Sequence, residues 1–428
     1  MSEYLIEKSN YIFSGELKVP GDKSISHRAV ILSTFNKDMT KITNLLLSDD
    51  VKSTMYAVGS IGVMFAENNG KIFTRGTGIR EYLESPETID CGNSGTTARL
   101  LTGLLSGQNF KSVLDGDKSL RLRPMDRVKE PLEKIGANIS TNNGNMPITI
   151  NPSKINGGNI KITSPSAQVK SAVILAGLTG DSELNIELEV ETRNHTEIML
   201  DNFTENIKIN NNKVLITPDP KIINDTIDVP NDPSSAAFFI IGALLNVNSH
   251  LILSQVCINP LRIKFIDILK EMGGDISFEN EGILSGEPVA DIIVKSSSLK
   301  GINISKNDIP KLIDEIPVIA LALSLAQGNS KIEGLSELRF KESDRITSIV
   351  SQLSILGADI KNIGDDIEIS GVEELKGGLC DSFDDHRIAM MIAIASTRCK
   401  NDVKISNYNC VDISYPNFFE SFTKFKKD

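Results

Sequence analysis

Apolar residues along the chain form short runs that follow polar, turn-forming residues at regular intervals. Each run of Ala, Leu, Ile and Val comes after a short strand-like segment and a turn rich in Gly, Ser, Asp or Pro. This pattern predicts a strand, a turn and a buried helix, and it recurs roughly every 70 residues. It occupies residues 17–35, 87–105, 160–178, 226–245, 302–324 and 377–396. We expect equivalent turn positions at Ser24, Ser94, Ser166, Ser234 and Asp384.

A second pattern lies between these runs: an amphipathic helix that stops at a glycine and is followed by a strand. The stops are expected at Gly62, Gly136, Gly273 and Gly357, with a degenerate copy near Asn206. The two patterns together predict six β-α-β-α-β-β units, and therefore two domains of three units each. Chance similarity among ordinary α/β segments is the alternative, but it does not explain why both patterns recur in phase.

Length and composition fit this organisation. A chain of 428 residues is too long for one ordinary core, and its apolar fraction of 40% is enough for two. The net charge of -11 argues against a nucleic-acid binder. The five cysteines form no C-x-x-C pair, no apolar run is long enough to span a membrane, and the first ten residues contain no secretory apolar region. We therefore expect a cytoplasmic protein with reduced thiols.

Charged residues are concentrated where the predicted turns lead into helices. Backbone N–H groups and the helix dipole favour anions at such positions. In the first turn, Lys23 and Ser24 begin a helix and Arg28 lies one turn later, which is suited to a phosphate or carboxylate. In the second, the glycines around Gly95 allow a ligand to approach the backbone. The simpler explanation of the first segment is a capped surface helix, and that of the second is a plain tight turn.

Three further segments in the first half carry polar donors. Arg123 stands in a cationic loop with Arg121 and Arg127, which is also compatible with a solvated face. The segments SPSAQVK and TRNH precede apolar helices. They supply Ser166, Gln168, Arg193 and His195 as possible ligand contacts. Ordinary N-capping by Ser166 explains the segment SPSAQVK equally well.

The second half carries acidic residues as well as cations at its turns. Asp314 and Glu315 lead into an apolar helix, where partial burial is able to tune a general base. KESDR contributes Lys341, Glu342 and Arg345, and DDHR contributes Asp384 to Arg387. His386 is expected to form hydrogen bonds and Arg387 to bind an anion. Asp384, Asp385 and His386 are residue types that bind metals, but no second cluster in the chain has metal-ligand spacing, so we expect no metal. An acidic chain with cations at its helix starts is suited to small anionic substrates.

These segments resemble the EPSP synthase (3-phosphoshikimate 1-carboxyvinyltransferase) family of enolpyruvyl transferases. The resemblance covers roughly residues 17–419 and is carried by PGDKSISHRA, GNSGTTARL, RPM, SAQVKSA, TRNHTE, IDEIP, KESDRI, DDHRIAM and SYPNFF. It implies an α/β fold of two similar domains, each of three βαβαββ repeats in an inside-out α/β barrel, with a cleft between them. The implied domains are 1–20 with 232–428, and 21–231, with Pro-marked crossovers near Pro20 and Pro233.

The resemblance also implies an activity: transfer of the enolpyruvyl group of phosphoenolpyruvate to the 5-hydroxyl of shikimate 3-phosphate in the shikimate pathway. It assigns catalysis to Asp314, Glu342 and Lys23. Shikimate 3-phosphate is assigned to Lys23, Ser24, Arg28, Ser166, Gln168, Arg193, Asp314 and Lys341. Phosphoenolpyruvate is assigned to Lys23, Gly95, Arg123, Gln168, Arg345 and Arg387, with His386 nearby. No cofactor is implied, and we expect a monomer without nucleic-acid or membrane partners.

Two positions depart from the family pattern. Some members have a Lys three residues before the Pro of the C-terminal motif, where this chain has Ile413 before Pro416. Some have two serines before the Gln, where this chain has Ala167. The alternative activity is enolpyruvyl transfer to UDP-N-acetylglucosamine. Many of those enzymes use a Cys on a mobile loop, and the corresponding LDGDKSLRLRPM contains none.

Overall fold

The computed structural model describes residues 2–427 and divides the chain into two compact units. The inserted unit comprises Gly21–Pro230 together with the short turn Ile283–Glu287. The outer unit comprises the chain up to Pro20, Asn231–Gly282 and the chain from Pro288 onward. The sequence-based boundaries differ at two places. Asn231 packs with the outer unit, and Ile283–Glu287, the tip of a hairpin, packs with the inserted unit although the remainder of its two strands does not.

The inserted unit contains three repeats of one βαβαββ pattern. The middle repeat is β7 (Ile89–Asp90), α3 (Gly95–Leu105), β8 (Ser112–Asp115), α4 (Asp126–Lys134), β9 (Asn138–Asn142) and β10 (Asn145–Asn151). β7 pairs with β8 in parallel, and β10 pairs antiparallel with both β8 and β9. The sheet order is therefore β7-β8-β10-β9, in which one parallel crossover is followed by a hairpin.

The other two repeats of this unit have the same order. One contains β11 (Gly158–Ile162), α5 (Ala167–Leu178), β12 (Leu184–Leu188), α6 (His195–Phe203), β13 (Ile207–Asn210) and β14 (Lys213–Ile216). The other contains α1 (Lys23–Ser33), β4 (Met39–Thr43), α2 (Asp49–Gly59), β5 (Met64–Asn68) and β6 (Lys71–Arg75). Its first strand is β15 (Thr226–Asp228), which pairs in parallel with β4. The last strand of the unit thus completes its first sheet.

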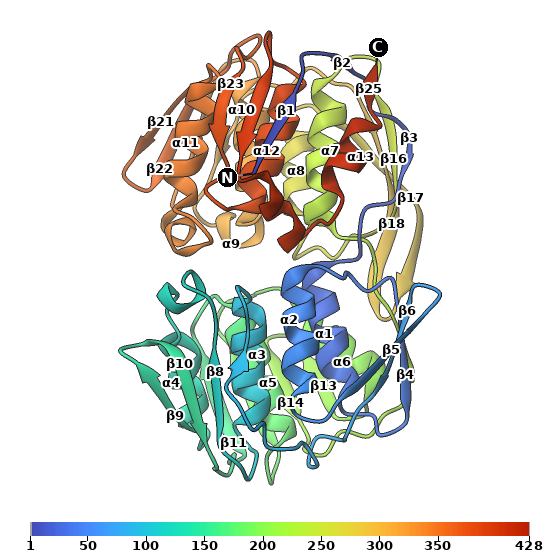
Figure 1. The fold of residues 1–428 in the computed structure, drawn as a ribbon, viewed down its shortest axis with the longest axis vertical. Coiled ribbons are helices and arrows are strands. Elements are labelled where there is room, and N and C mark those ends of the chain that lie inside the picture. The colour runs from blue at the N-terminus through green and yellow to red at the C-terminus, as the bar shows by residue number, and fades with distance from the viewer. Residues whose placement is uncertain (1, 428) are drawn as a thin grey trace. The chain divides into compact units, whose positions relative to one another are not determined.

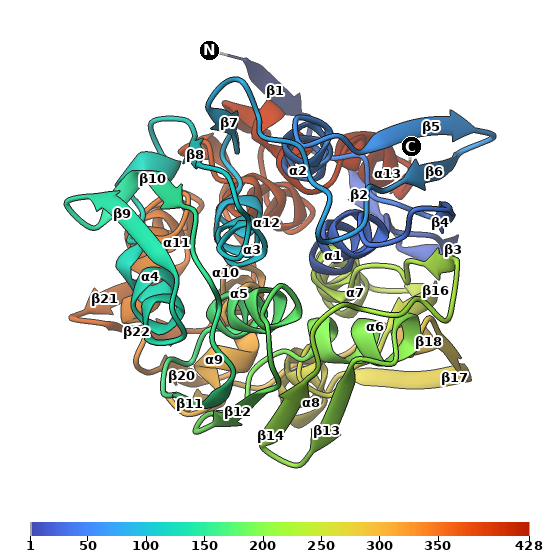
Figure 2. The same cartoon turned by 90° about the horizontal axis from the view of Figure 1, so that it is seen from below.

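The apolar helices lie at the centre of the inserted unit, and the open sheets surround them. Figure 2 shows α1, α3 and α5 inside and the three sheets outside. α3 and α5 approach closely because Gly103 faces the backbone of α5: a Cβ at this position would lie 2.1 Å from the Ala172 carbonyl oxygen. This arrangement explains why these helices are apolar on nearly every side.

The outer unit repeats the pattern with one shortened copy. Its first repeat is β3 (Ser14–Leu17), α7 (Pro233–Leu245), β16 (His250–Cys257), α8 (Lys264–Glu271), β17 (Asp275–Leu284) and β18 (Glu287–Lys295). Its second is β19 (Asn303–Ile304), α9 (Ile309–Leu312), α10 (Ile316–Ser324), β20 (Asn329–Ile332), η2 (Ser336–Phe340), α11 (Arg345–Ile355), β21 (Asp359–Ile363) and β22 (Asp366–Ser370). Its third contains β23 (Gly378–Asp381), α12 (His386–Ser396) and β24 (Val403–Ser406).

In this third repeat, β1 (Glu3–Ile6) takes the place of the usual hairpin by pairing antiparallel with β24. The chain then continues through the 3-10 helix η3 (Tyr408–Ile413) and α13 (Phe418–Thr423), and β25 (Lys426–Lys427) pairs with β2 (Asn10–Tyr11).

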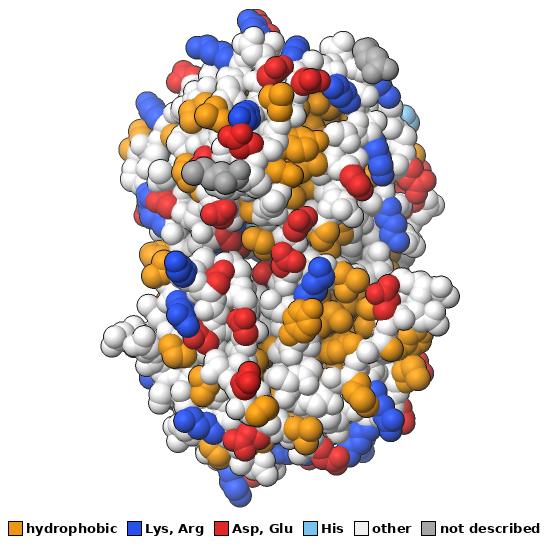
Figure 3. Space-filling view, in the orientation of Figure 1, with side chains coloured by type: hydrophobic (Ala, Val, Ile, Leu, Met, Phe, Trp, Pro, Cys, Tyr) orange, Lys and Arg blue, Asp and Glu red, His pale blue; other side chains and the backbone are white. Residues whose placement is uncertain are grey.

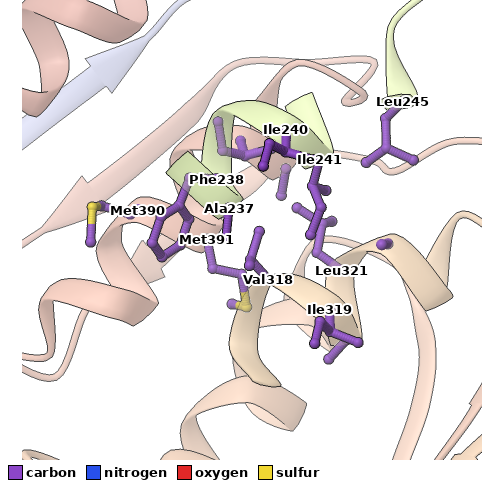
Figure 4. Packing of buried hydrophobic residues seen from close by; sticks show 14 of the residues in the cluster. Ala237, Phe238, Ile240, Ile241, Leu245, Val318, Ile319, Leu321, Met390 and Met391 are labelled. Carbon is purple, nitrogen blue, oxygen red and sulfur yellow. The ribbon is translucent and has the colours of Figure 1, made fainter. Parts of the chain in front are cut away.

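The core of the outer unit is built on α7, α10 and α12 (Figure 1). Figure 4 shows Phe238 and Ile241 of α7, Val318 of α10 and Met391 of α12 turned toward one another. The N-termini of the three helices lie in different repeats, so their packing fixes three sequence-distant turns relative to each other.

The predicted glycine stops are confirmed. Gly62, Gly136, Gly273 and Gly357 have φ between +94° and +103°, a region that favours glycine at helix C-termini. Asn206 differs, because it has no positive φ and instead donates its side-chain amide to the Thr217 and Pro218 carbonyl oxygens. The degenerate copy is therefore held by side-chain hydrogen bonds.

Charged side chains of both signs are interspersed over the face that Figure 3 draws. None of the helices among residues 2–427 has the length and apolarity needed to cross a membrane. All five cysteines are free, and only Cys410 is not fully buried.

Candidate active site

In the inserted unit, the first polar turn places a lysine at the start of α1. Asp22 caps this helix by accepting a hydrogen bond from the Ile25 N–H at 2.8 Å. Lys23 is the first residue of the helix, and its Nζ lies 2.5 Å from Oδ2 of Asp50 at the start of α2. The N-cap is therefore Asp22, and Lys23 and Ser24 stand at the helix start as predicted. Asp50 is a site residue that sequence reasoning missed, because Lys23 and Asp50 belong to successive helices.

Arg28 is buried and connects three helices of the inserted unit. Its Nε donates to Thr196 Oγ1 on α6 at 2.7 Å, and its Nη2 donates to Ser171 Oγ on α5 at 2.8 Å. Its Nη1 donates to the Ser24 carbonyl oxygen at 2.9 Å. The guanidinium is therefore fixed in orientation next to the polar turn that carries Lys23 and Ser24.

The second polar turn is joined to the arginine loop and to α5. Arg123 donates to Asn93 Oδ1 at 2.6 Å. A Cβ on Gly95 would lie 3.0 Å from Arg99 Nη1 and 3.3 Å from Arg123 Nη1, so the glycine admits both guanidinium groups. Arg99 in turn donates to Gln168 Oε1 at 2.6 Å. Gly95, Arg123 and Gln168, predicted separately, belong to one connected cluster.

The remaining predicted residues of this unit lie at the starts of α5 and α6. Ser166 caps α5 by accepting from the Val169 N–H at 3.4 Å, as the simpler interpretation required. Arg193 is half-buried just before α6. Arg121, in contrast, is exposed and pairs with Asp115 at 2.5 Å, which lowers the pKa of that carboxyl. For Arg121, the solvated-face interpretation is correct.

In the outer unit, Arg345 gathers three carboxylates. Its guanidinium lies 2.7 Å from Asp385 Oδ2, 2.6 Å from Glu342 Oε2 and 3.7 Å from Asp314 Oδ1. Burial opposes the charge, but these carboxylates outweigh it and raise the pKa of Arg345 above its ordinary value. Only 1% of the Arg345 side chain is exposed, so it is a fixed positive charge beneath Asp314 and Glu342.

Asp314 is held from a second direction by Arg387. Nη2 of Arg387 lies 3.7 Å from Asp314 Oδ1, and its Nη1 donates to the Asp314 carbonyl oxygen at 2.9 Å. Asp385 caps α12 by accepting from the Arg387 N–H at 3.0 Å, and Asp384 is exposed in the preceding turn. Asp314 and Glu342 keep 17% and 16% of their side chains exposed, which leaves both accessible to a ligand.

A buried polar network behind Asp314 was not predicted. Glu315, next to Asp314 in sequence, accepts a short hydrogen bond from Ser234 Oγ at the start of α7. Arg262 donates to Ser234 Oγ at 3.0 Å and pairs with Asp232 at 3.2 Å. The network ties the Asp314 turn to α7. Its members are far apart in sequence, and no single motif indicates them.

Lys341 and His386 complete the predicted set. Lys341 is half-buried and directly follows η2, whereas His386 is buried as the first residue of α12. Among residues 2–427, no group of three His, Cys, Asp or Glu residues is arranged to hold a metal ion. The expectation of a metal-independent site stays a prediction.

The two units carry different chemistry. The cluster of the inserted unit is rich in cations and hydroxyls, and Asp50 pairs with Lys23 within it. The cluster of the outer unit holds Asp314 and Glu342 beside fixed arginines. The fold and these clusters indicate an α/β enzyme that acts on small-molecule substrates.

The chain belongs to the EPSP synthase (3-phosphoshikimate 1-carboxyvinyltransferase) family, whose model matches residues 7–422. A 3-phosphoshikimate 1-carboxyvinyltransferase of Endomicrobium trichonymphae is 44% identical over 427 residues, 98% of each chain. One from Thermodesulfovibrio yellowstonii is 44% identical over 428 residues, 99% of each. The solved EPSP synthase of Acinetobacter baumannii is 38% identical with a TM-score of 0.88, over 100% of this chain and 98% of that one.

Proposed function

We propose that this chain transfers the enolpyruvyl group of phosphoenolpyruvate to the 5-hydroxyl of shikimate 3-phosphate and releases phosphate. The observation that carries the proposal is the pairing of Asp314 and Glu342 on one buried arginine, in a chain whose family model matches residues 7–422. Two carboxylates at one site suit a reaction that needs a base at one atom and an acid at another.

The reaction consists of an addition followed by an elimination. The acceptor oxygen bonds to C2 of phosphoenolpyruvate, the hydroxyl proton leaves, and a proton adds to C3, which gives a tetrahedral ketal. Loss of a C3 proton and cleavage of the bond from C2 to the phosphate oxygen then give the enol ether and inorganic phosphate. No oxidation state changes overall, so the proposal assigns no redox cofactor.

Asp314 accepts the hydroxyl proton in this proposal. Its carbonyl oxygen is fixed by Arg387, and its carboxylate lies 3.7 Å from the guanidinium groups of both Arg345 and Arg387, which hold it in place. Glu342, together with Lys23, is assigned the transfer of the proton to and from C3. Glu342 contacts the same arginine at 2.6 Å and remains partly exposed.

The two substrates are assigned to different sets of residues, which share Lys23 and Gln168. Shikimate 3-phosphate is assigned to Lys23, Ser24, Arg28, Ser166, Gln168, Arg193, Asp314 and Lys341. Phosphoenolpyruvate is assigned to Lys23, Gly95, Arg123, Gln168, Arg345 and Arg387. Both sets draw on both units, so the proposal requires the two clusters to act on one pair of substrates. Positioning and charge neutralisation then provide much of the catalysis.

The alternative acceptor, UDP-N-acetylglucosamine, is not favoured by the comparisons, because the matching family and relatives carry the shikimate name. A phosphate-release assay tests the choice. With phosphoenolpyruvate present, we expect phosphate to appear with shikimate 3-phosphate and not with UDP-N-acetylglucosamine. Release with the sugar nucleotide alone would contradict the proposal. A monomeric state and a cytoplasmic location are further parts of the proposal.

A further inference from the structure

A buried ion pair in the inserted unit has no role in the mechanism above. Lys170 of α5 and Glu197 of α6 are 2.6 Å apart, with 2% and 4% of their side chains exposed. Lys170 also donates to the Thr192 carbonyl oxygen at 3.1 Å. Neither residue belongs to the sets assigned to the substrates.

Stability alone does not account for this pair. Removing two charges from water is costly, and a well-packed apolar pair of similar volume is often at least as stable as a buried ion pair. Glu197 Oε2 is also buried without a hydrogen-bond partner among residues 2–427, which adds a further desolvation penalty. The pair is therefore better explained by the geometry that it imposes.

The pair fixes both ends of the segment 192–197, which leads into α6. Lys170 holds Thr192 at one end and Glu197 at the other. Between them stands Arg193, and Thr196 Oγ1 accepts from Arg28 Nε at 2.7 Å. Thr196 and Ser171, the residue after Lys170, are themselves 2.6 Å apart through their hydroxyl oxygens.

A second buried pair holds the same segment. Nδ1 of His195 lies 2.6 Å from Oε1 of Glu287, and both side chains are 1% exposed. Glu287 ends the hairpin tip Ile283–Glu287, which among residues 231–427 is the only stretch that packs with the inserted unit. The segment 192–197 is thus fastened by buried polar pairs on two sides, whereas an ordinary surface loop has no such attachment.

We propose that Lys170 and Glu197 are positioning residues that preset Arg193 and Arg28 for the anion of shikimate 3-phosphate. The inference rests on the proposed function, because it takes the ligand from it. A preset segment loses little conformational entropy when the ligand binds, so the affinity for shikimate 3-phosphate is higher. The pair itself does not contact the substrate.

The test replaces the pair by apolar residues in Lys170→Met/Glu197→Leu. We expect the free energy of unfolding to be unchanged or higher, while the dissociation constant and KM for shikimate 3-phosphate rise about tenfold or more. The KM for phosphoenolpyruvate and kcat at saturation are expected to change little. Titration calorimetry and steady-state kinetics measure these quantities.

The matched control is Lys161→Met/Glu189→Leu, which removes an exposed ion pair of 3.5 Å in the same repeat. It should leave every constant near its wild-type value. A swapped pair, Lys170→Glu/Glu197→Lys, keeps opposite charges but turns a carboxylate toward the Thr192 carbonyl oxygen. We expect it not to restore affinity.

The outcomes separate the two proposals. Wild-type protein that neither binds nor converts shikimate 3-phosphate would overturn the proposed function, and the positioning role with it. Wild-type protein that is active, with a double variant of unchanged affinity, would overturn the positioning role alone. If the apolar variant is unstable, Lys170→Met/Glu197→Gln, which removes the hydrogen bond from Lys170 to the Thr192 carbonyl oxygen and the charge of Glu197, is held to the same affinity criterion.

Discussion

At the scale of single residues, the chemistry depends on how Arg345 arranges the carboxylates around it. Asp385 is fully buried against this arginine, whereas Asp314 and Glu342 reach it from partly exposed positions. Asp385 holds Arg345 in place from the buried side. The proposal assigns proton transfer to the two partly exposed carboxylates, Asp314 and Glu342.

Asp314→Asn and Glu342→Gln test this division of roles. Each amide keeps the shape of the side chain but is unable to accept a proton, so we expect kcat to fall by about a hundredfold or more in each variant. Steady-state phosphate release measures the effect. Glu16→Gln, an exposed carboxylate of the outer unit, serves as the control. Undiminished turnover in either variant would refute the role of that residue.

His27 gives the inserted unit a pH dependence of stability. Burial lowers its pKa well below 6.5, the Lys23 and Arg28 charges lower it further, and Asp22 opposes them. In the unfolded chain His27 takes up a proton near pH 6.5, whereas in the folded chain it remains neutral at that pH. His27 contributes stability above that pH, and the contribution is lost as the pH falls below it.

We expect the free energy of unfolding to drop between pH 7.5 and pH 5, and to drop less in His27→Asn. Asn places an amide near the ring Nδ1, which lies 2.6 Å from Thr54 Oγ1. Urea unfolding at both pH values measures the change. His250→Asn is the matched control, because His250 is exposed. An identical pH dependence in wild type and His27→Asn would contradict this account.

At the scale of elements, close contact between α3 and α5 aligns two of the polar turns of the inserted unit. Gly103→Ala places a Cβ against the Ala172 carbonyl oxygen, so we expect a loss of about 1–3 kcal/mol in the free energy of unfolding. Gly59→Ala in α2 is the control. A Cβ there meets nothing within 4 Å, and alanine should stabilise the helix by roughly 0.5–1 kcal/mol. Equal effects at the two glycines would refute the contact.

The elements were predictable from sequence where local chemistry specifies them. Apolar runs after polar turns gave the helices around which both units are built, and the positive φ of Gly136 and Gly357 follows from their place after apolar stripes. Pairings between distant segments were not predictable. β15 completes the sheet of β4, and β1 takes the place of a hairpin beside β24, because an edge left open by one segment is filled by another.

The same distinction applies to the site. Lys23, Arg123, Asp314 and Arg345 stand in polar turns before helices, where their charge is visible in the sequence. The residues that hold them are less visible. Asp50 looks like an ordinary residue of a helix start. Ser234, which Arg262 contacts, meets Glu315 only after two repeats have packed. Such partners are specified by tertiary packing, which no local pattern records.

At the scale of the whole molecule, the central claim is that cations of both units serve one substrate. Arg123 belongs to the inserted unit and Arg387 to the outer unit, and both are assigned to phosphoenolpyruvate. Neither unit alone carries the full set of charges that the proposal requires. A carboxylate and a phosphate on one small molecule are better neutralised by several fixed guanidinium groups than by one.

The most direct test is the KM for phosphoenolpyruvate in Arg123→Gln and Arg387→Gln, measured at saturating shikimate 3-phosphate. We expect it to rise about tenfold or more in each variant, because each removes a charge-assisted contact to the same ligand. An unchanged KM in either variant, with the other impaired, would contradict the claim that both units bind phosphoenolpyruvate.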